Sequence, residues 1–129
     1  MKKEIITIPG IHIPDTGFYH IVRAGDFLFL TSQLSADLNT GKVLGGDISE
    51  QTRQSLENVK RLLASCGATM DDIVKVILYL RNVNDRQRVN QVYREYFAQG
   101  QEPAKVTVQA PSPIDGIDIE IEVTAVVPS

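Results

Sequence analysis

The sequence predicts an α+β domain in which two helices pack on one face of a mixed β-sheet. Two segments have the 3.6-residue period of amphipathic helices, and short runs rich in β-branched residues lie before, between and after them. The resulting order is β-β-β-α-β-α-β-β. No linker, repeat or change of composition divides residues 1–129, so we expect a single domain.

The N-terminal part of the chain predicts three short strands and a helix. The strands are expected at residues 5–8, 19–24 and 27–31, with Gly25-Asp26 as a two-residue hairpin turn. The helix that follows has apolar residues three and four positions apart: Leu56, Val59, Leu63 and Cys66. It is expected to start at a capping box formed by Asp47 and Glu50 and to stop at Gly67.

The second half of the chain predicts a strand, a helix and two further strands. Residues 73–80 predict a central strand, and a helix is expected from Asn84 to Gly100. The apolar face of this helix comprises Val89, Val92, Tyr93, Tyr96 and Phe97. Residues 105–108 predict a short strand, and residues 117–127 predict a long one because apolar and polar residues alternate strictly.

The strand at residues 73–80 is apolar on both faces, although the two helices can cover only one. We expect one face to carry Val74, Val76, Leu78 and Leu80, and the other Ile73, Ile77 and Tyr79. Burying such a side chain stabilises by roughly 1.5–3 kcal/mol, so a bare second face would be a large apolar patch. We therefore expect a homo-oligomer; a monomer at micromolar concentration in size-exclusion chromatography with light scattering would contradict this.

Composition and charge exclude several classes of function. Thirteen basic and sixteen acidic residues give a net charge of −3, which disfavours nucleic acid as a partner. One cysteine and two unpaired histidines, His12 and His20, disfavour a disulfide framework and a metal site. The chain lacks phosphate-binding glycine motifs and an apolar run of the ~20 residues that a membrane span needs. Alternating rather than continuous apolar residues follow Met1-Lys2-Lys3, so we expect no signal peptide. We expect a cytoplasmic protein with no membrane partner.

An acidic cluster and a single lysine are the candidate catalytic or ligand-binding residues. Asp118, Glu120 and Glu122 lie on one face of the last predicted strand. They form either a solvated surface or, in a crevice, a carboxyl cluster suited to proton transfer. Lys105 is either an exposed lysine, a fixed positive charge for a substrate carboxylate, or an amine nucleophile if desolvated. The residues alone leave these alternatives open.

Segments along most of the chain resemble the RidA/YjgF family of reactive-intermediate (enamine/imine) deaminases. They are Gln51–Val59, Asp72–Lys75, Asn84-Asp85, Val89–Tyr93, Phe97, Pro103-Ala104 and Ile119–Glu122, and the resemblance extends over residues 5–127. It implies a chorismate-mutase-like fold and a homotrimer with a central barrel, with clefts between subunits that hold the ligand. It also implies hydrolysis of imines to 2-oxo acids and ammonia without a metal or cofactor.

The resemblance assigns roles to individual residues. Glu120 matches the carboxylate that positions or activates water, and Asn90 matches a ligand-contacting asparagine. Thr31 keeps a hydroxyl in the family's Ser-Gly-Gln element, whereas Phe18 stands at the ligand-side tyrosine and removes its hydroxyl. Thr107 stands where many members have cysteine. Phe18, Thr31, Asn90 and Thr107 are therefore the expected substrate-binding residues.

Lys105 is the main departure, because it replaces the arginine of the family's Pro-Ala-Arg motif. Arginine holds a carboxylate through two parallel N–H bonds, whereas lysine offers a movable point charge. Losing one charge-assisted hydrogen bond costs about 1.5–3 kcal/mol, which corresponds to roughly tenfold or more in affinity or rate. Lys105 and Glu120 are nevertheless the expected catalytic residues.

Three functions follow as hypotheses. The first is a cofactor-free hydrolase or deaminase acting on small imines or enamines, with weakened or altered activity. The second is a non-catalytic trimer that binds small carboxylates, since both the arginine and the tyrosine are absent. The third is a ribonuclease, as an older family label suggests, and the negative charge and the lack of paired histidines argue against it.

Overall fold

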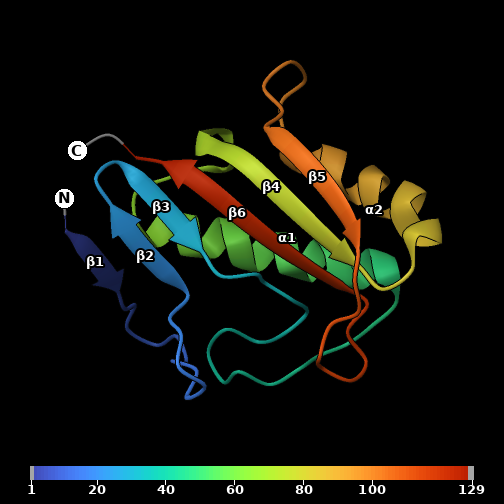
Figure 1. The fold of residues 1–129 in the computed structure, drawn as a ribbon, viewed down its shortest axis with the longest axis horizontal. Coiled ribbons are helices and arrows are strands. Elements are labelled where there is room, and N and C mark those ends of the chain that lie inside the picture. The colour runs from blue at the N-terminus through green and yellow to red at the C-terminus, as the bar shows by residue number, and fades with distance from the viewer. Residues whose placement is uncertain (1, 128–129) are drawn as a thin grey trace.

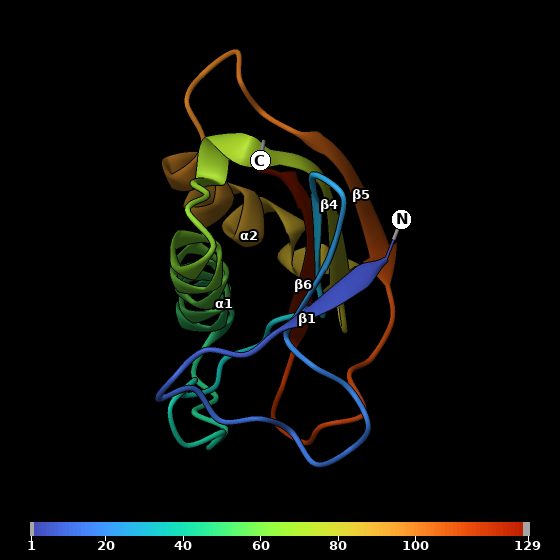
Figure 2. The same ribbon diagram turned by 90° about the vertical axis from the view of Figure 1, so that its left-hand side faces the viewer.

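The computed structural model describes residues 2–127 and contains the predicted order of elements. The strands are β1 (Lys3–Ile6), β2 (Ile21–Ala24), β3 (Phe27–Leu30), β4 (Ile73–Leu80), β5 (Ala104–Gln109) and β6 (Ile119–Val126), and the helices are α1 (Ile48–Ser65) and α2 (Arg86–Tyr93). The strands form one mixed sheet in the order β1-β2-β3-β6-β4-β5, in which only β4 and β5 pair in parallel. Both helices lie on one face of this sheet, which confirms the fold class (Figures 1 and 2).

The first two strands are shifted or shorter than the sequence predicts. β1 ends at Ile6, opposite Ile21, because the ladder between β1 and β2 ends there. The predicted residues Thr7 and Ile8 therefore lie in a loop. The β2–β3 turn is confirmed, since Ala24 pairs with Phe27 across Gly25-Asp26. Gly25 has a φ of 61°, which favours glycine.

The capping box of α1 is confirmed. The Asp47 carboxylate accepts a hydrogen bond from the Glu50 backbone N–H at 2.8 Å, and the Glu50 carboxylate accepts one from the Asp47 N–H at 3.0 Å. The apolar stripe of α1 is completely buried at Leu56, Val59 and Leu63. Gln51 Nε2 donates a hydrogen bond to the Gly116 carbonyl at 3.0 Å, so the start of the helix lies beside the loop that leads into β6.

The second helix is shorter than predicted. α2 extends over Arg86–Tyr93, between single 3₁₀ turns at Val83–Asp85 and Arg94–Tyr96. The side chain that caps the first of these turns is Asn82, which accepts a hydrogen bond from the Asn84 N–H at 2.9 Å. The predicted start at Asn84 was therefore wrong in its capping residue, although the predicted apolar face is buried at Val89, Val92, Tyr93 and Phe97.

The core lies between the helices and one face of the sheet. β6 alternates as predicted, with Ile119, Ile121, Val123 and Ala125 buried. On β4, Val76, Leu78 and Leu80 are buried beside them. The prediction was wrong for the start of β4: Ile73 is buried and Val74 is exposed, because a register irregularity between Ile73 and Lys75 reverses the alternation.

The other face of the sheet carries exposed apolar side chains. Phe27 and Phe29 on β3 are 46% and 48% exposed, and Val106 and Val108 on β5 are 43% and 38% exposed. No helix covers this face in the described part of the chain (Figure 2). We call it the open face. Its apolar character agrees with the expected patch, and self-association through it remains a prediction.

Candidate functional site

The sheet register places the two predicted catalytic residues on opposite faces. Lys105 pairs with Val76 in β4, and Val76 points into the core under the helices. Glu120 pairs with Tyr79, which belongs to the open face. Because paired residues share a face of the sheet, Lys105 and Glu120 are separated by the sheet within one chain. One protomer therefore does not bring them together.

Glu120 is held by two serine hydroxyls on the open face. Ser32 Oγ donates a hydrogen bond to Glu120 Oε1 at 2.6 Å, and Ser112 Oγ donates one to Oε2 at 2.5 Å. The Ser112 hydroxyl in turn accepts a hydrogen bond from the Ile114 N–H at 3.1 Å. Both carboxylate oxygens are engaged, so the orientation of the half-buried Glu120 is fixed.

A cavity of about 250 Å³ lies beside Glu120. Ser32, Ser112, Tyr79 and Glu122 contribute to its lining. Tyr79 donates its hydroxyl to Glu122 Oε1 at 2.8 Å, and this bond, followed by desolvation, raises the pKa of Tyr79. The cavity thus combines two carboxylates with three hydroxyls, an arrangement that can hold a water molecule or a small polar ligand.

Two residues that the sequence reasoning missed hold this arrangement in place. Ser112 lies in the loop before β6, outside every segment that carries the family resemblance. Gln51 is completely buried and links α1 to that loop. Its Nε2 donates to the Gly116 carbonyl at 3.0 Å, and its Oε1 accepts from the Asp118 N–H at 2.8 Å. The available signal in the sequence was the position of Gln51: it lies eight residues before Val59, one of the spacings that recur on the apolar face of a helix.

Lys105 lies on the helix face, where it meets a second predicted residue. Its Nζ donates a hydrogen bond to Asn90 Oδ1 in α2 at 2.9 Å and lies 4.6 Å from the centre of the Tyr93 ring. Desolvation, followed by the positive charges of Arg94 and Arg86, lowers the pKa of Lys105. Thr107 shares this face, since it pairs with the buried Leu78. Asn90, Lys105 and Thr107 thus lie at the sheet edge formed by β5.

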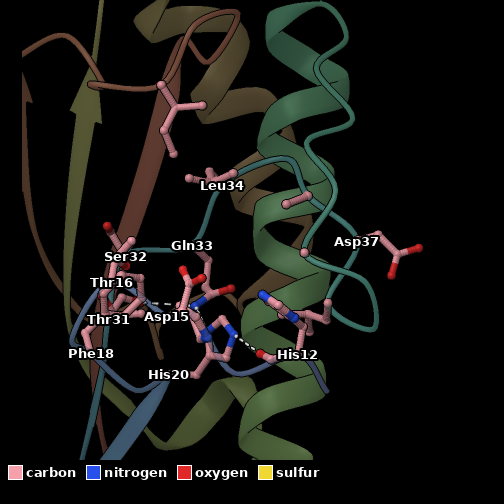
Figure 3. Close-up of a pocket in the computed structure, with 15 residues that line it drawn as sticks. His12, Asp15, Thr16, Phe18, His20, Thr31, Ser32, Gln33, Leu34 and Asp37 are labelled. Atoms are coloured by element: carbon pink, nitrogen blue, oxygen red, sulfur yellow. Dashed lines mark hydrogen bonds between the residues drawn. The ribbon is translucent and has the colours of Figure 1, made fainter. Parts of the chain in front are cut away.

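Phe18 and Thr31 line a different cavity of about 290 Å³, formed mainly by the segments at residues 12–20 and 31–41 (Figure 3). Ser32 lines both this cavity and the cavity beside Glu120, and its hydroxyl donates to Glu120 Oε1. Phe18 and Thr31 consequently belong with Glu120. The six predicted residues form two groups in one chain: Phe18, Thr31 and Glu120, and Asn90, Lys105 and Thr107.

His20 is fixed as a neutral imidazole in the cavity that holds Phe18. Its Nε2 lies 3.2 Å from the His12 carbonyl oxygen, which can only accept, so Nε2 carries the proton. Its Nδ1 lies 3.1 Å from the amide nitrogen of Gln33, which donates (Figure 3). Desolvation is the main cause that lowers the pKa of His20 from 6.5; the bond to the His12 backbone opposes it, and the His12 charge adds to it.

This lowered pKa predicts a loss of stability in mild acid. Well above pH 6.5, His20 is neutral in both the folded and the unfolded protein. As the pH falls through 6.5, the unfolded chain binds a proton more readily than the folded chain does, because the pKa of His20 is lowered in the folded protein. The free energy of unfolding should therefore fall as the pH falls from about 7 to 5. Urea unfolding at fixed protein concentration measures it, and His20→Gln should show a smaller fall. Equal falls in both proteins would contradict the assignment to His20.

Residues 2–127 contain neither a cluster of metal-ligating side chains nor a membrane-spanning helix. No three histidine, cysteine, aspartate or glutamate side chains in this range are close enough together to hold a metal ion. Within the same range, neither helix is long and apolar enough to cross a membrane.

Comparisons with known proteins agree with this architecture. The model of a family described as Endoribonuclease L-PSP matches residues 12–127. A RutC family protein of Pyrococcus horikoshii is 39% identical over 95% of this chain and 97% of its own. A protein of Dermatophagoides farinae named 2-iminobutanoate/2-iminopropanoate deaminase is 31% identical over 97% of both chains.

Solved structures of similar proteins share the whole fold. A Rid family protein of unknown function from Yersinia pestis has a TM-score of 0.89 and 31% identity, covering 98% of this chain and 100% of its own. A YjgF family member from Neisseria meningitidis has a TM-score of 0.83 and 26% identity, covering 100% of this chain and 98% of its own. The expected fold is therefore confirmed over nearly the full length.

Proposed function

Because the chain belongs to the Endoribonuclease L-PSP family, which includes the RidA/YjgF proteins, we propose that it hydrolyses small imines or enamines without a metal or cofactor. The observation that carries the proposal is Glu120, whose carboxylate is oriented by two serine hydroxyls beside a cavity. A relative that is 31% identical and named an imine deaminase supports it.

We propose further that the site is completed between protomers of a homotrimer. Lys105 and Glu120 lie on opposite faces of the sheet, so a second chain must supply one of them. The exposed phenylalanines and valines of the open face favour self-association beside Glu120. In such a cleft one protomer contributes Asn90, Lys105 and Thr107, and its neighbour contributes Phe18, Thr31 and Glu120.

The residues suggest a direct hydrolysis. The Lys105 ammonium attracts the carboxylate of the substrate, and Asn90 holds the ammonium in place at 2.9 Å. Glu120 takes a proton from water as the water oxygen bonds to the imine carbon. Return of protons to the nitrogen lets ammonia leave and forms the carbonyl group. The products are a 2-oxo acid and ammonia, so atoms and charge balance.

A coupled assay tests the proposal. A dehydratase generates 2-aminoacrylate or 2-iminobutanoate in solution, and loss of the imine is followed in the presence and absence of the protein. The protein is expected to accelerate this loss. A rate equal to that in buffer, at protein concentrations where the oligomer is present, would contradict the proposal.

A carboxylate-binding protein without catalysis is the second candidate. The Lys105 Nζ already contacts Asn90 and the Tyr93 ring. It therefore has fewer hydrogen bonds to donate to a substrate carboxylate than an arginine guanidinium has. Thermal-shift measurements with small carboxylates, followed by the imine assay, separate the two functions. Stabilisation by a carboxylate together with no turnover selects the binding protein.

A further inference from the structure

Lys105 differs from an ordinary surface lysine in how its amine is held. Lys105 is exposed on the edge strand β5, yet its Nζ has a defined position. Asn90 Oδ1 accepts a hydrogen bond from Nζ at 2.9 Å, and the Tyr93 ring lies 4.6 Å away on the same side. A small molecule can therefore reach an amine that is already oriented.

The charges around Lys105 oppose a further positive charge. Arg86 in α2 and Arg94 in the following turn both lower the pKa of Lys105, in addition to the larger effect of desolvation. The Glu102 carboxylate acts on Tyr93, whose ring lies against Nζ. The neutral fraction of an amine rises about tenfold for each unit by which its pKa falls. More neutral, nucleophilic amine is therefore present than at an ordinary lysine.

We propose that the amine of Lys105 forms a reversible imine with 2-oxo acids. The Nζ lone pair bonds to C2 of the oxo acid, the two hydrogens of the neutral amine pass to the carbonyl oxygen, and water leaves. The choice of 2-oxo acids rests on the proposed function, of which they are the products, whereas the reactivity of the amine rests on its surroundings.

The surroundings also favour a carbonyl compound that carries a carboxylate. Arg86 and Arg94 add positive charge beside Nζ and attract an anion to it. A guanidinium itself forms no such imine, because it is not deprotonated in proteins. Replacement of an arginine by Lys105 thus adds a reactivity to this site that an arginine lacks.

Reductive trapping tests the proposal. The protein is incubated with pyruvate and sodium cyanoborohydride at neutral pH, and modified lysines are located by mass spectrometry of peptides. We expect Lys105 to gain a carboxyethyl group several times faster than Lys75, which is exposed on the neighbouring strand β4 and serves as the internal control. Acetone, a ketone without a carboxylate, should label Lys105 less than pyruvate does.

Two results would overturn the proposal: labelling of Lys105 no faster than that of Lys75, or no labelling at all. The Lys105→Arg variant keeps the positive charge and should lose the adduct at this peptide. The same variant is expected to raise imine hydrolysis, because arginine binds a carboxylate through two bonds. Trapping without imine hydrolysis would leave the amine chemistry standing while the proposed function fails, so the two failures are distinguishable.

Discussion

Replacing Glu120 with glutamine is expected to lower the rate of imine hydrolysis by about 10²–10⁴-fold, the range for loss of a general acid–base group. Glutamine has the same shape, but it cannot take a proton from water. Ser32 and Ser112 can rotate their hydroxyls to suit an amide, so the fold should survive. The measurement is the coupled imine assay, with thermal unfolding as the check on stability.

Glu122 provides a matched control for this substitution. It lies two residues from Glu120 on the same strand and face, lines the same cavity and has a hydroxyl partner in Tyr79. The Glu122→Gln variant should retain most of the activity, because the Glu122 carboxylate accepts the Tyr79 hydroxyl and the proposed hydrolysis takes the proton from water at Glu120. Equal losses in both variants would show that the charge of the cavity matters rather than the Glu120 carboxylate.

Local sequence signals predicted most of the fold because each depends on neighbouring residues. The capping box of α1 needs only Asp47 and Glu50, and both of its hydrogen bonds form. The alternation of residues 119–126 needs only the two-residue period of a strand, and its apolar set is buried. The same period correctly separated Glu120 and Glu122 from the core.

The parts that were wrong or missed depend on contacts between distant segments. The register irregularity between Ile73 and Lys75 arises where β4 pairs with β6, and no local sequence pattern predicts it. Ser112 becomes part of the site only because its loop, tied to α1 by Gln51, brings it to Glu120. Whether Lys105 and Glu120 share a face depends on how β5 and β6 each pair with β4, and local sequence patterns do not specify this pairing.

Because Lys105 and Glu120 are separated within one chain, we expect activity to recover when the impaired variants Lys105→Ala and Glu120→Gln are mixed. Lys105→Ala removes a charge-assisted bond of about 1.5–3 kcal/mol and should lower the rate roughly tenfold to a hundredfold. Glu120→Gln should be lower still. If each cleft takes Lys105 from one protomer and Glu120 from its neighbour, equal mixing leaves about a quarter of the clefts intact.

Activity should therefore recover to about a quarter of the wild-type value when the two variants are unfolded together and refolded as a mixture. The control replaces Lys105→Ala by the double variant with Lys105→Ala and Glu120→Gln, so that no protomer contains Glu120 and no cleft can be complete. Mass spectrometry of the intact oligomers establishes that mixed assemblies form. Mixed assemblies without recovery would mean that the two residues never meet across an interface, and direct hydrolysis by this pair would then be untenable, since the sheet already separates them within one chain.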